Sequence, residues 1–278
     1  MTSPSRRTNG YALPALSASG ATEFVRESGR ALDRSCTSLA NRRVTRLSDE
    51  IAQGRTLDAQ LLLLTVATGI LDATTFKSYR VFTTKQTGNT LFLAMYALDR
   101  TVLSHQIEKN VAASIFAFIA GGIFFGYLGR RQLRTREWLL WTNFLQTVLV
   151  LLATKVRYWT PDRNVGLPAL VIVALLAFAS SGQITMAVGL GMSKMNTTMI
   201  TGNLIDFASD PRVFGRRNAL RARRVLFYLS LLVGCFVGAM LYTPDAWIGL
   251  LLAAIIKAIV GLSFIWNPAV EDVDGETS

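Results

Sequence analysis

The chain has 278 residues, of which 51% are hydrophobic and 17% are charged, and its mean hydropathy is +0.35. This composition excludes collagen, a disordered chain and a disulfide-rich scaffold. Two cysteines and a single histidine also exclude a CxxC metal site and a His cluster. The net charge of +11 is concentrated beside apolar blocks, which favours a membrane surface over nucleic acid as a partner.

Six long apolar blocks dominate the chain after a polar segment, residues 1–58, that we expect to be largely disordered and cytoplasmic. Each block has the length that spans a bilayer, and only as a helix can it satisfy its backbone there. The blocks cover residues 59–76, 111–129, 138–156, 167–190, 225–243 and 246–266. Residues 267–278 form an acidic tail. The sequence therefore predicts an all-α polytopic membrane protein with a transmembrane domain over residues 59–266.

Two shorter apolar runs lie between the long blocks, and neither can span a bilayer alone. Both follow the same tripeptide: Thr87-Gly88-Asn89 precedes residues 90–98, and Thr201-Gly202-Asn203 precedes residues 204–208. Thr and Asn side chains can cap a helix N-terminus, and Gly allows close approach to the backbone. We therefore expect each tripeptide to begin a short broken or re-entrant helix.

The order and spacing of these features indicate an internal repeat. Both tripeptide asparagines precede the next long block by 22 residues (111 − 89 and 225 − 203). Both of those blocks carry a GxxxG pair, which is typical of helix packing within or between chains. The pairs are Gly122 with Gly126 and Gly234 with Gly238. The predicted three-helix repeats cover residues 59–156 and 167–266.

The basic residues predict the orientation in the membrane, because cytoplasmic loops carry an excess of Lys and Arg. With a cytoplasmic N-terminus and six spans, the connections 130–137 and 191–224 face the cytoplasm with four and seven Lys/Arg. The exception is 77–110, which places five outside. Three spans per repeat would invert the second copy and leave both termini cytoplasmic. The Arg-rich loops are expected to attract anionic lipid headgroups.

Polar residues inside membrane spans are functional candidates by default, because their burial in lipid is costly. Asp72 and Lys257 are the two deepest ionisable residues, and we predict that they pair. Short broken helices at corresponding positions of inverted halves point to a transporter binding site. The predicted substrate path is lined by Asp72, Thr87, Gly88, Asn89, Gln183, Thr201, Gly202, Asn203, Asp206 and Lys257.

Two stretches also carry a family resemblance. Gly69–Ala73 followed by Gln86–Thr90 resembles the first half of the YoaK-type family of integral membrane proteins of unknown function. Gly182-Gln183 followed by Thr201-Gly202-Asn203 resembles its second half. The resemblance implies a six-helix membrane protein, and it supplies no established substrate or catalytic residue.

We predict a transporter or channel-like protein for a small solute, because this function explains the repeat, the short segments and the buried polar residues together. The alternative is a non-transporting membrane scaffold or assembly factor that packs through its GxxxG helices and forms a homo-oligomer. An enzyme is not expected, because the sequence shows no nucleophile–base pair and no HExxH, P-loop or Rossmann signature. No cofactor, metal or nucleic acid is expected either.

Overall fold

The computed structural model describes the greater part of the unit Leu47–Ser278. The described residues are 49–52, 54–99, 105–130, 132, 134–160, 165–191, 219–242, 245–268 and 270. They are helical apart from connections and one isolated β-bridge. The second tripeptide, Asp206 and most of the Arg-rich connection 191–224 lie outside the described residues, as do residues 1–48.

Six helices in this part of the chain are long and apolar enough to cross a membrane, and they coincide with the six predicted blocks. They are α2 (Arg55–Tyr79), α4 (His105–Gly129), α5 (Arg136–Trp159), α6 (Leu167–Gly189), α8 (Ala219–Leu241) and α9 (Ala246–Ser263), which continues as the 3-10 helix η2 (Phe264–Trp266). α2, α4 and α8 begin earlier than hydropathy predicts, because each starts with a polar segment. Asp58 near the start of α2 and Arg223 near the start of α8 form an ion pair.

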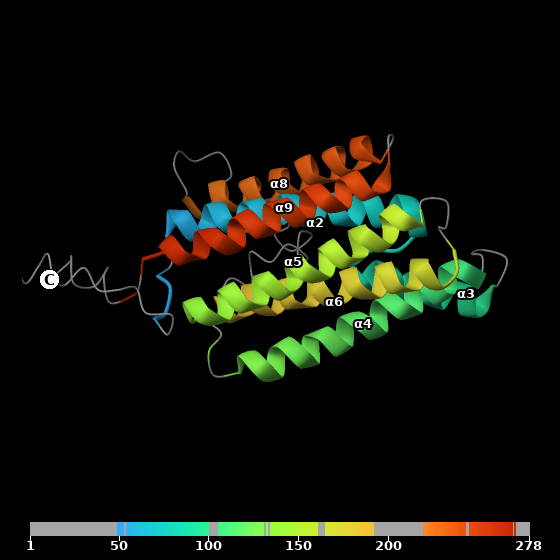
Figure 1. Cartoon of the computed structure of the whole chain (residues 1–278), viewed down its shortest axis with the longest axis horizontal. Coiled ribbons are helices and arrows are strands. Elements are labelled where there is room, and N and C mark those ends of the chain that lie inside the picture. The colour runs from blue at the N-terminus through green and yellow to red at the C-terminus, as the bar shows by residue number, and fades with distance from the viewer. Residues whose placement is uncertain are drawn as a thin grey trace, which may run out of the picture. The chain divides into compact units, whose positions relative to one another are not determined.

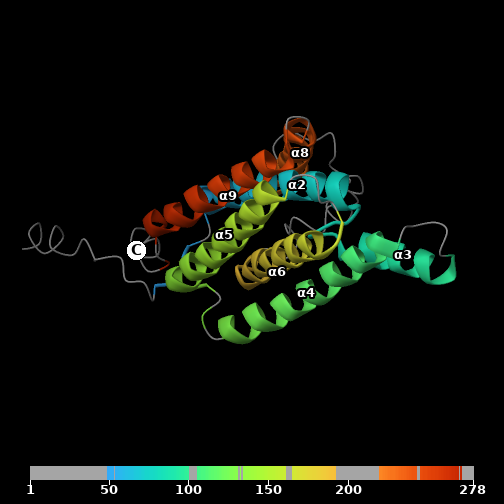
Figure 2. The same cartoon turned by 45° about the vertical axis from the view of Figure 1, so that its right-hand side comes forward.

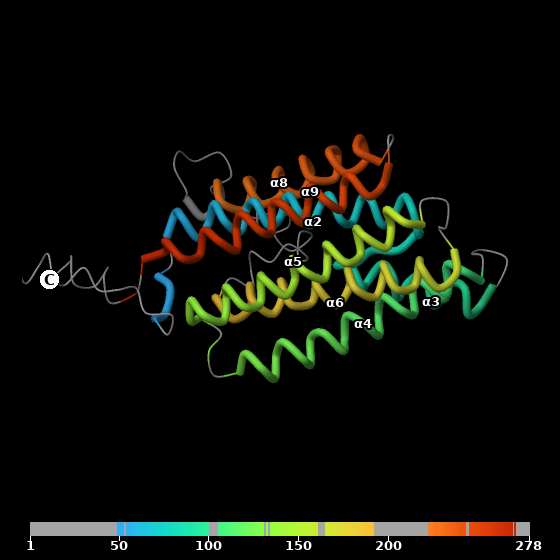
Figure 3. The backbone as a smooth tube through the Cα atoms, in the orientation of Figure 1, coloured from blue at the N-terminus to red at the C-terminus, as the bar shows by residue number. Residues whose placement is uncertain are grey.

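The long helices pack side by side in pairs (Figures 1 and 2). α2 packs on α8 and α9, α4 packs on α6, and α5 packs on α6 and α9. Figure 3 shows that α2, α5 and α8 run in one direction along the bundle and that α4, α6 and α9 run in the other. The main apolar core lies where α2, α5, α6 and α9 meet, and includes Ile70, Val150, Leu176 and Leu250.

α3 (Gln86–Leu98) is the short helix that contains the first tripeptide. Its 13 residues extend about 20 Å, at 1.5 Å per residue, so it cannot span a bilayer. It packs beside α4 near the end of the bundle where α2 ends. Its other side exposes apolar residues, with Leu91 59% and Leu98 92% accessible. A short helix is therefore present after residue 85, and its re-entry into the bilayer stays a prediction.

Residues 49–52 are folded onto the bundle, although we expected them to belong to a disordered segment. The amide of Ile51 donates to the carbonyl of Arg134 (3.1 Å), and the amide of Ala52 donates to that of Pro268 (3.0 Å). The adjoining side chains Gln60 and Asn267 exchange two amide hydrogen bonds of 2.7 Å. We call these contacts the terminal clasp, since they join the beginning of α2 and the residues before it to the end of the α9–η2 segment and to the connection before α5.

Glycine determines the close contact between α2 and α8. A Cβ atom on Gly69 would lie 2.5 Å from the carbonyl oxygen of Leu231, and one on Gly238 would lie 2.7 Å from that of Ile70. Gly234 lies directly against the Val66 carbonyl. Any side chain at these positions would force the two backbones apart, so the second GxxxG pair packs within the chain.

The first GxxxG pair behaves differently. A Cβ atom on Gly122 or Gly126 would meet nothing within 4 Å, so neither glycine packs against another described helix. α4 approaches α6 instead through Gly121, which lies against Ser181 and Phe178. The prediction that Gly122 and Gly126 form a packing seam is therefore wrong for contacts within the chain. The contact face is one residue, or about 100°, further around the helix.

The two GxxxG pairs provide a matched test of this packing. We expect Gly234→Ala to destabilise the protein by about 1–3 kcal/mol, because overpacking displaces backbone atoms. Gly122→Ala should leave stability unchanged or raise it by up to about 1 kcal/mol, because alanine favours a helix more than glycine and its Cβ atom would meet nothing there. Thermal unfolding in detergent would measure both. Equal losses of stability in the two variants would contradict the observed packing.

Candidate functional site

Asp72 is buried near the end of α2, with 2% of its surface exposed. Its Oδ1 accepts hydrogen bonds from the backbone amides of Thr83 (3.1 Å) and Thr84 (3.2 Å) and from the Thr83 hydroxyl (3.1 Å). Its Oδ2 lies 2.5 Å from both the Thr84 hydroxyl and Lys85 Nζ. A carboxylate has about four acceptor sites, so these five donors satisfy it fully. Asp72 thereby folds the connection after α2 back onto the helix.

Asn89 is fully buried and fixes the same connection from the other side. Its Oδ1 accepts from the Phe82 amide (3.0 Å), and its Nδ2 donates to the Phe82 carbonyl (2.7 Å). The Ser114 hydroxyl of α4 also donates to the Phe82 carbonyl (2.9 Å). The asparagine side chain therefore pairs with the backbone of Phe82 as a neighbouring strand would.

The other tripeptide residues take no part in this network. Thr87 is exposed, and a Cβ atom on Gly88 would lie 3.3 Å from the Phe82 ring. The N-cap of α3 is Lys85, and no side chain caps the amides there. The expectation that Thr87 or Asn89 caps the short helix is therefore wrong. The tripeptide lies in the first turn of α3, and its asparagine binds the preceding connection.

Lys257 is buried at 1% exposure in the middle of α9. Its Nζ donates to the side-chain oxygens of Gln146 on α5 (2.9 Å) and Gln183 on α6 (2.5 Å). Gln183 in turn donates to the Thr68 hydroxyl of α2 (2.9 Å). Four helices from both halves of the chain thus meet at one cation. Among the described residues, no carboxylate pairs with it.

The predicted pairing of Asp72 with Lys257 is therefore wrong. Asp72 pairs with Lys85, whereas Lys257 binds two neutral amides. The residue that links Lys257 to α2 nevertheless lies on the same face of that helix as Asp72. Thr68, which bonds to Gln183, precedes Asp72 by four residues, and such residues lie one above the other on a helix. A line of polar side chains therefore runs from Lys257 in the centre to Lys85 near the bundle end.

Several buried polar atoms on α5 and α6, the helices whose glutamines bind Lys257, have no hydrogen-bond partner in the structure: Thr142 Oγ1, Asn143 Nδ2, Gln146 Nε2 and Ser180 Oγ. Buried polar groups are almost always satisfied by protein or by ordered water. Thr142, Asn143 and Gln146 lie within about one turn of α5. Ser180 precedes Gln183 by three residues on α6. Gln146 contacts Lys257 directly, and Thr142 and Ser180 lie within about one turn of the two glutamines, so the centre of the bundle has a surplus of groups that can donate a hydrogen bond.

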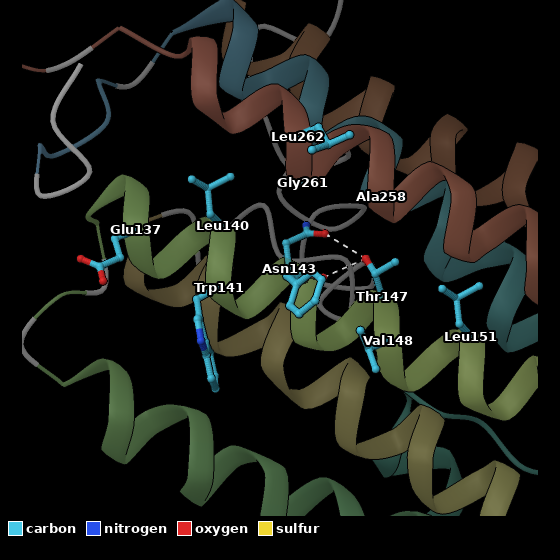
Figure 4. A pocket seen from close by; sticks show the side chains of 11 residues that line it. Glu137, Leu140, Trp141, Asn143, Thr147, Val148, Leu151, Ala258, Gly261 and Leu262 are labelled. Atoms are coloured by element: carbon cyan, nitrogen blue, oxygen red, sulfur yellow. Dashed lines mark hydrogen bonds between the residues drawn. The ribbon is translucent and has the colours of Figure 1, made fainter. Parts of the chain in front are cut away.

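A separate groove of about 530 Å³ lies between α5 and α9 (Figure 4). Its walls are mainly apolar, and two of its side chains, Phe144 and Leu262, are 68% and 61% exposed. Asn143 faces Gly261 across it, and a Cβ atom on that glycine would lie 3.0 Å from Asn143 Oδ1. Because the groove is apolar and outward-facing and is not lined by Lys257, we assign it to the lipid-facing surface.

The described residues contain no group of three or more His, Cys, Asp or Glu placed to bind a metal ion. A family model described as "Protein of unknown function (DUF1275)" matches residues 60–263. The chain belongs to this family. The DUF1275 match begins in the second turn of α2 and ends at the last residue of α9, so it includes both Asp72 and Lys257. No curated protein and no solved structure matches the chain.

The Asn89 network predicts an unequal effect of two substitutions in one tripeptide. Asn89→Ala leaves the buried amide and carbonyl of Phe82 with fewer partners, so it should cost about 1–3 kcal/mol of stability. Thr87→Ala removes an exposed hydroxyl and should cost less than about 0.5 kcal/mol. Thermal unfolding of both variants in detergent checks this. A stable Asn89→Ala variant would show that Asp72 and the Ser114 hydroxyl suffice to hold the connection.

Proposed function

We propose that this protein moves a small, negatively charged solute across a membrane between two inverted halves, with Lys257 as the central binding residue. The observation that carries the proposal is a buried lysine that no described carboxylate neutralises. Replacing a buried charge with a well-packed apolar side chain is often neutral or stabilising, so stability does not explain this lysine. An anionic solute would supply the missing charge, and the unpartnered donors beside Lys257 would complete its hydrogen bonds.

The packing of the helices supports two related halves. Exchanging α2 with α6, α4 with α8 and α5 with α9 converts the α2–α8 pair into the α4–α6 pair and the α5–α6 pair into the α2–α9 pair, and it leaves the α5–α9 pair unchanged. In each exchange the two helices run in opposite directions, as inverted repeats require. Glycines at close contacts are separated by one common interval, 113 residues, from Gly69 to Gly182 and from Gly121 to Gly234. This interval of 113 residues is one longer than the 112 residues that separate the two GxxxG pairs.

Thr68 and Asp72 lie on one face of α2, between the Gln183 amide and Lys85, so polar groups extend from the centre of the bundle to its end. Midplane sites between inverted halves are the usual arrangement in secondary transporters. The scaffold alternative draws on a different observation, the outward-facing Gly122 and Gly126, which leave a small-residue stripe for a second chain.

The inverted arrangement of the two halves can be tested directly, by finding from which side of the membrane each tripeptide is accessible. In a background with Cys36→Ser and Cys235→Ser, we expect Thr87→Cys and Thr201→Cys to react with a membrane-impermeant thiol reagent from opposite sides. Thr87 is exposed, so its substitution avoids the Asn89 network. Reaction of both cysteines from the same side would remove the inverted arrangement, and with it the transport model.

The function itself can be tested with the purified chain in proteoliposomes. Applied gradients of chloride, acetate or phosphate should drive a current on a solid-supported membrane, and Lys257→Met should reduce it at least about tenfold, as loss of a charged hydrogen bond of about 1.5–3 kcal/mol requires. The matched control is Lys155→Met, which removes an exposed lysine from α5. Unchanged flux in Lys257→Met, or no flux in the wild type, would favour the scaffold.

A further inference from the structure

We propose that a pocket between α2 and α8 binds the headgroup and one acyl chain of an anionic phospholipid. The pocket has a volume of about 450 Å³. It lies at the end of α2, beside the connection that Asp72 holds. Its walls come from α2, α8 and that connection: Asp72, Ala73, Phe76, Lys77, Arg80, Phe82, Lys85, Leu232, Cys235, Phe236 and Ala239.

The polar side of the pocket has a positive charge that the protein does not compensate. Lys85 is paired with Asp72, the only acidic residue in the lining. Lys77 and Arg80 are exposed, and neither pairs with a carboxylate in the part of the chain that the structure describes. Aromatic rings orient both, since Lys77 Nζ lies 4.4 Å from the centre of the Tyr242 ring and the Arg80 guanidinium lies 5.8 Å from that of Phe76. Two oriented cations can bind one phosphate group.

The backbone of Arg80 gives a second, independent observation. It has φ 56° and ψ 35°, the left-handed conformation that ends α2. Glycine is the usual residue there, because a Cβ atom is unfavourable in this region. Arg80 is the one non-glycine residue with positive φ among the described residues. The chain therefore retains a guanidinium at a backbone position where it costs stability, and such strain is concentrated at functional sites.

The apolar side of the pocket favours a lipid over a free anion. Leu232, Phe236 and Ala239 lie on α8, where Phe236 is 63% exposed, so this wall continues along the membrane-facing side of the helix. Phe76 and Phe82 stack beside it with ring centres 4.7 Å apart. Charged groups at the end of a transmembrane helix lie at the level of the headgroups. A phosphate at Lys77 and Arg80 would place an acyl chain against this apolar wall, whereas inorganic phosphate would leave the wall unused.

The site is independent of the proposed transport function, because it uses neither Lys257 nor a gradient. Native mass spectrometry of the full chain, from micelles with equal phosphatidylglycerol and phosphatidylcholine, measures which lipid it retains. We expect preferential retention of phosphatidylglycerol. Arg80→Gly should reduce this preference about tenfold, equivalent to about 1.4 kcal/mol. Lys155→Met, which removes an exposed lysine that lies outside the pocket and outside the Arg-rich loops, should leave it unchanged.

Two further measurements distinguish the possible ligands and roles. Ala239→Trp should fill the apolar wall and lower phosphatidylglycerol retention while both cations remain. Thermal unfolding of Arg80→Gly should show equal or higher stability, because glycine suits the left-handed backbone. Equal retention by wild type and Arg80→Gly would overturn the site. Displacement of the lipid by inorganic phosphate would overturn the lipid assignment and identify a free-anion site.

Discussion

A carboxylate that is removed from water must be surrounded by donors, and Asp72 obtains them from the residues that directly follow its own helix. This requirement determines the local path of the chain. Because Thr83, Thr84 and Lys85 bind Asp72, the connection after α2 turns inward and is buried. Its backbone must then be satisfied in turn, and Asn89 pairs with Phe82 for that purpose. The beginning of α3 is thus a consequence of one buried charge.

Lys257 illustrates a different solution to the same constraint. Its ammonium group is held by two neutral side-chain amides. The Nε2 atoms of these two glutamines differ in their own hydrogen bonds. Gln183 Nε2 reaches Thr68 and the Leu64 carbonyl, whereas Gln146 Nε2 has no partner. A closed structural network would pair every member. The incomplete pairing occurs where both halves of the chain meet, which is why we place the solute there.

The sequence was sufficient for the number of long helices and for most of their ends, because hydropathy reports the length of an apolar segment. It was insufficient for partners, since depth in the membrane does not say which way a side chain points. Asp72 and Lys257 are both deep but bind different groups. The packing face of α4 was missed by one residue, Gly121 instead of Gly122, because a GxxxG spacing does not reveal which side of a helix meets a neighbour. Gln146 carried the same signal as Gln183, an amide side chain inside an apolar block, and was overlooked.

Short polar segments were the hardest to predict. Residues 49–52 have no periodicity that distinguishes them from a tail, and their pairing depends on residues more than 80 positions away. Thr83, Thr84 and Lys85 also read as an ordinary loop. The feature that could have identified them is Asp72 in the preceding apolar block. A polar run that closely follows a buried acid can supply its hydrogen-bond donors.

The terminal clasp makes the two ends of the bundle mechanically unequal. At one end, the reciprocal amide pair between Gln60 and Asn267 fastens the first helix of one half to the last segment of the other, and Arg136 adds a 2.6 Å hydrogen bond to the Asn267 carbonyl. The α5 end at Trp159 has an edge-on ring contact between Tyr158 and Trp247 instead. Rings can slide past one another at little cost, whereas amide pairs must break. If the halves rock during the proposed transport, the amide pairs of the clasp must break, so the motion would begin at the opposite end.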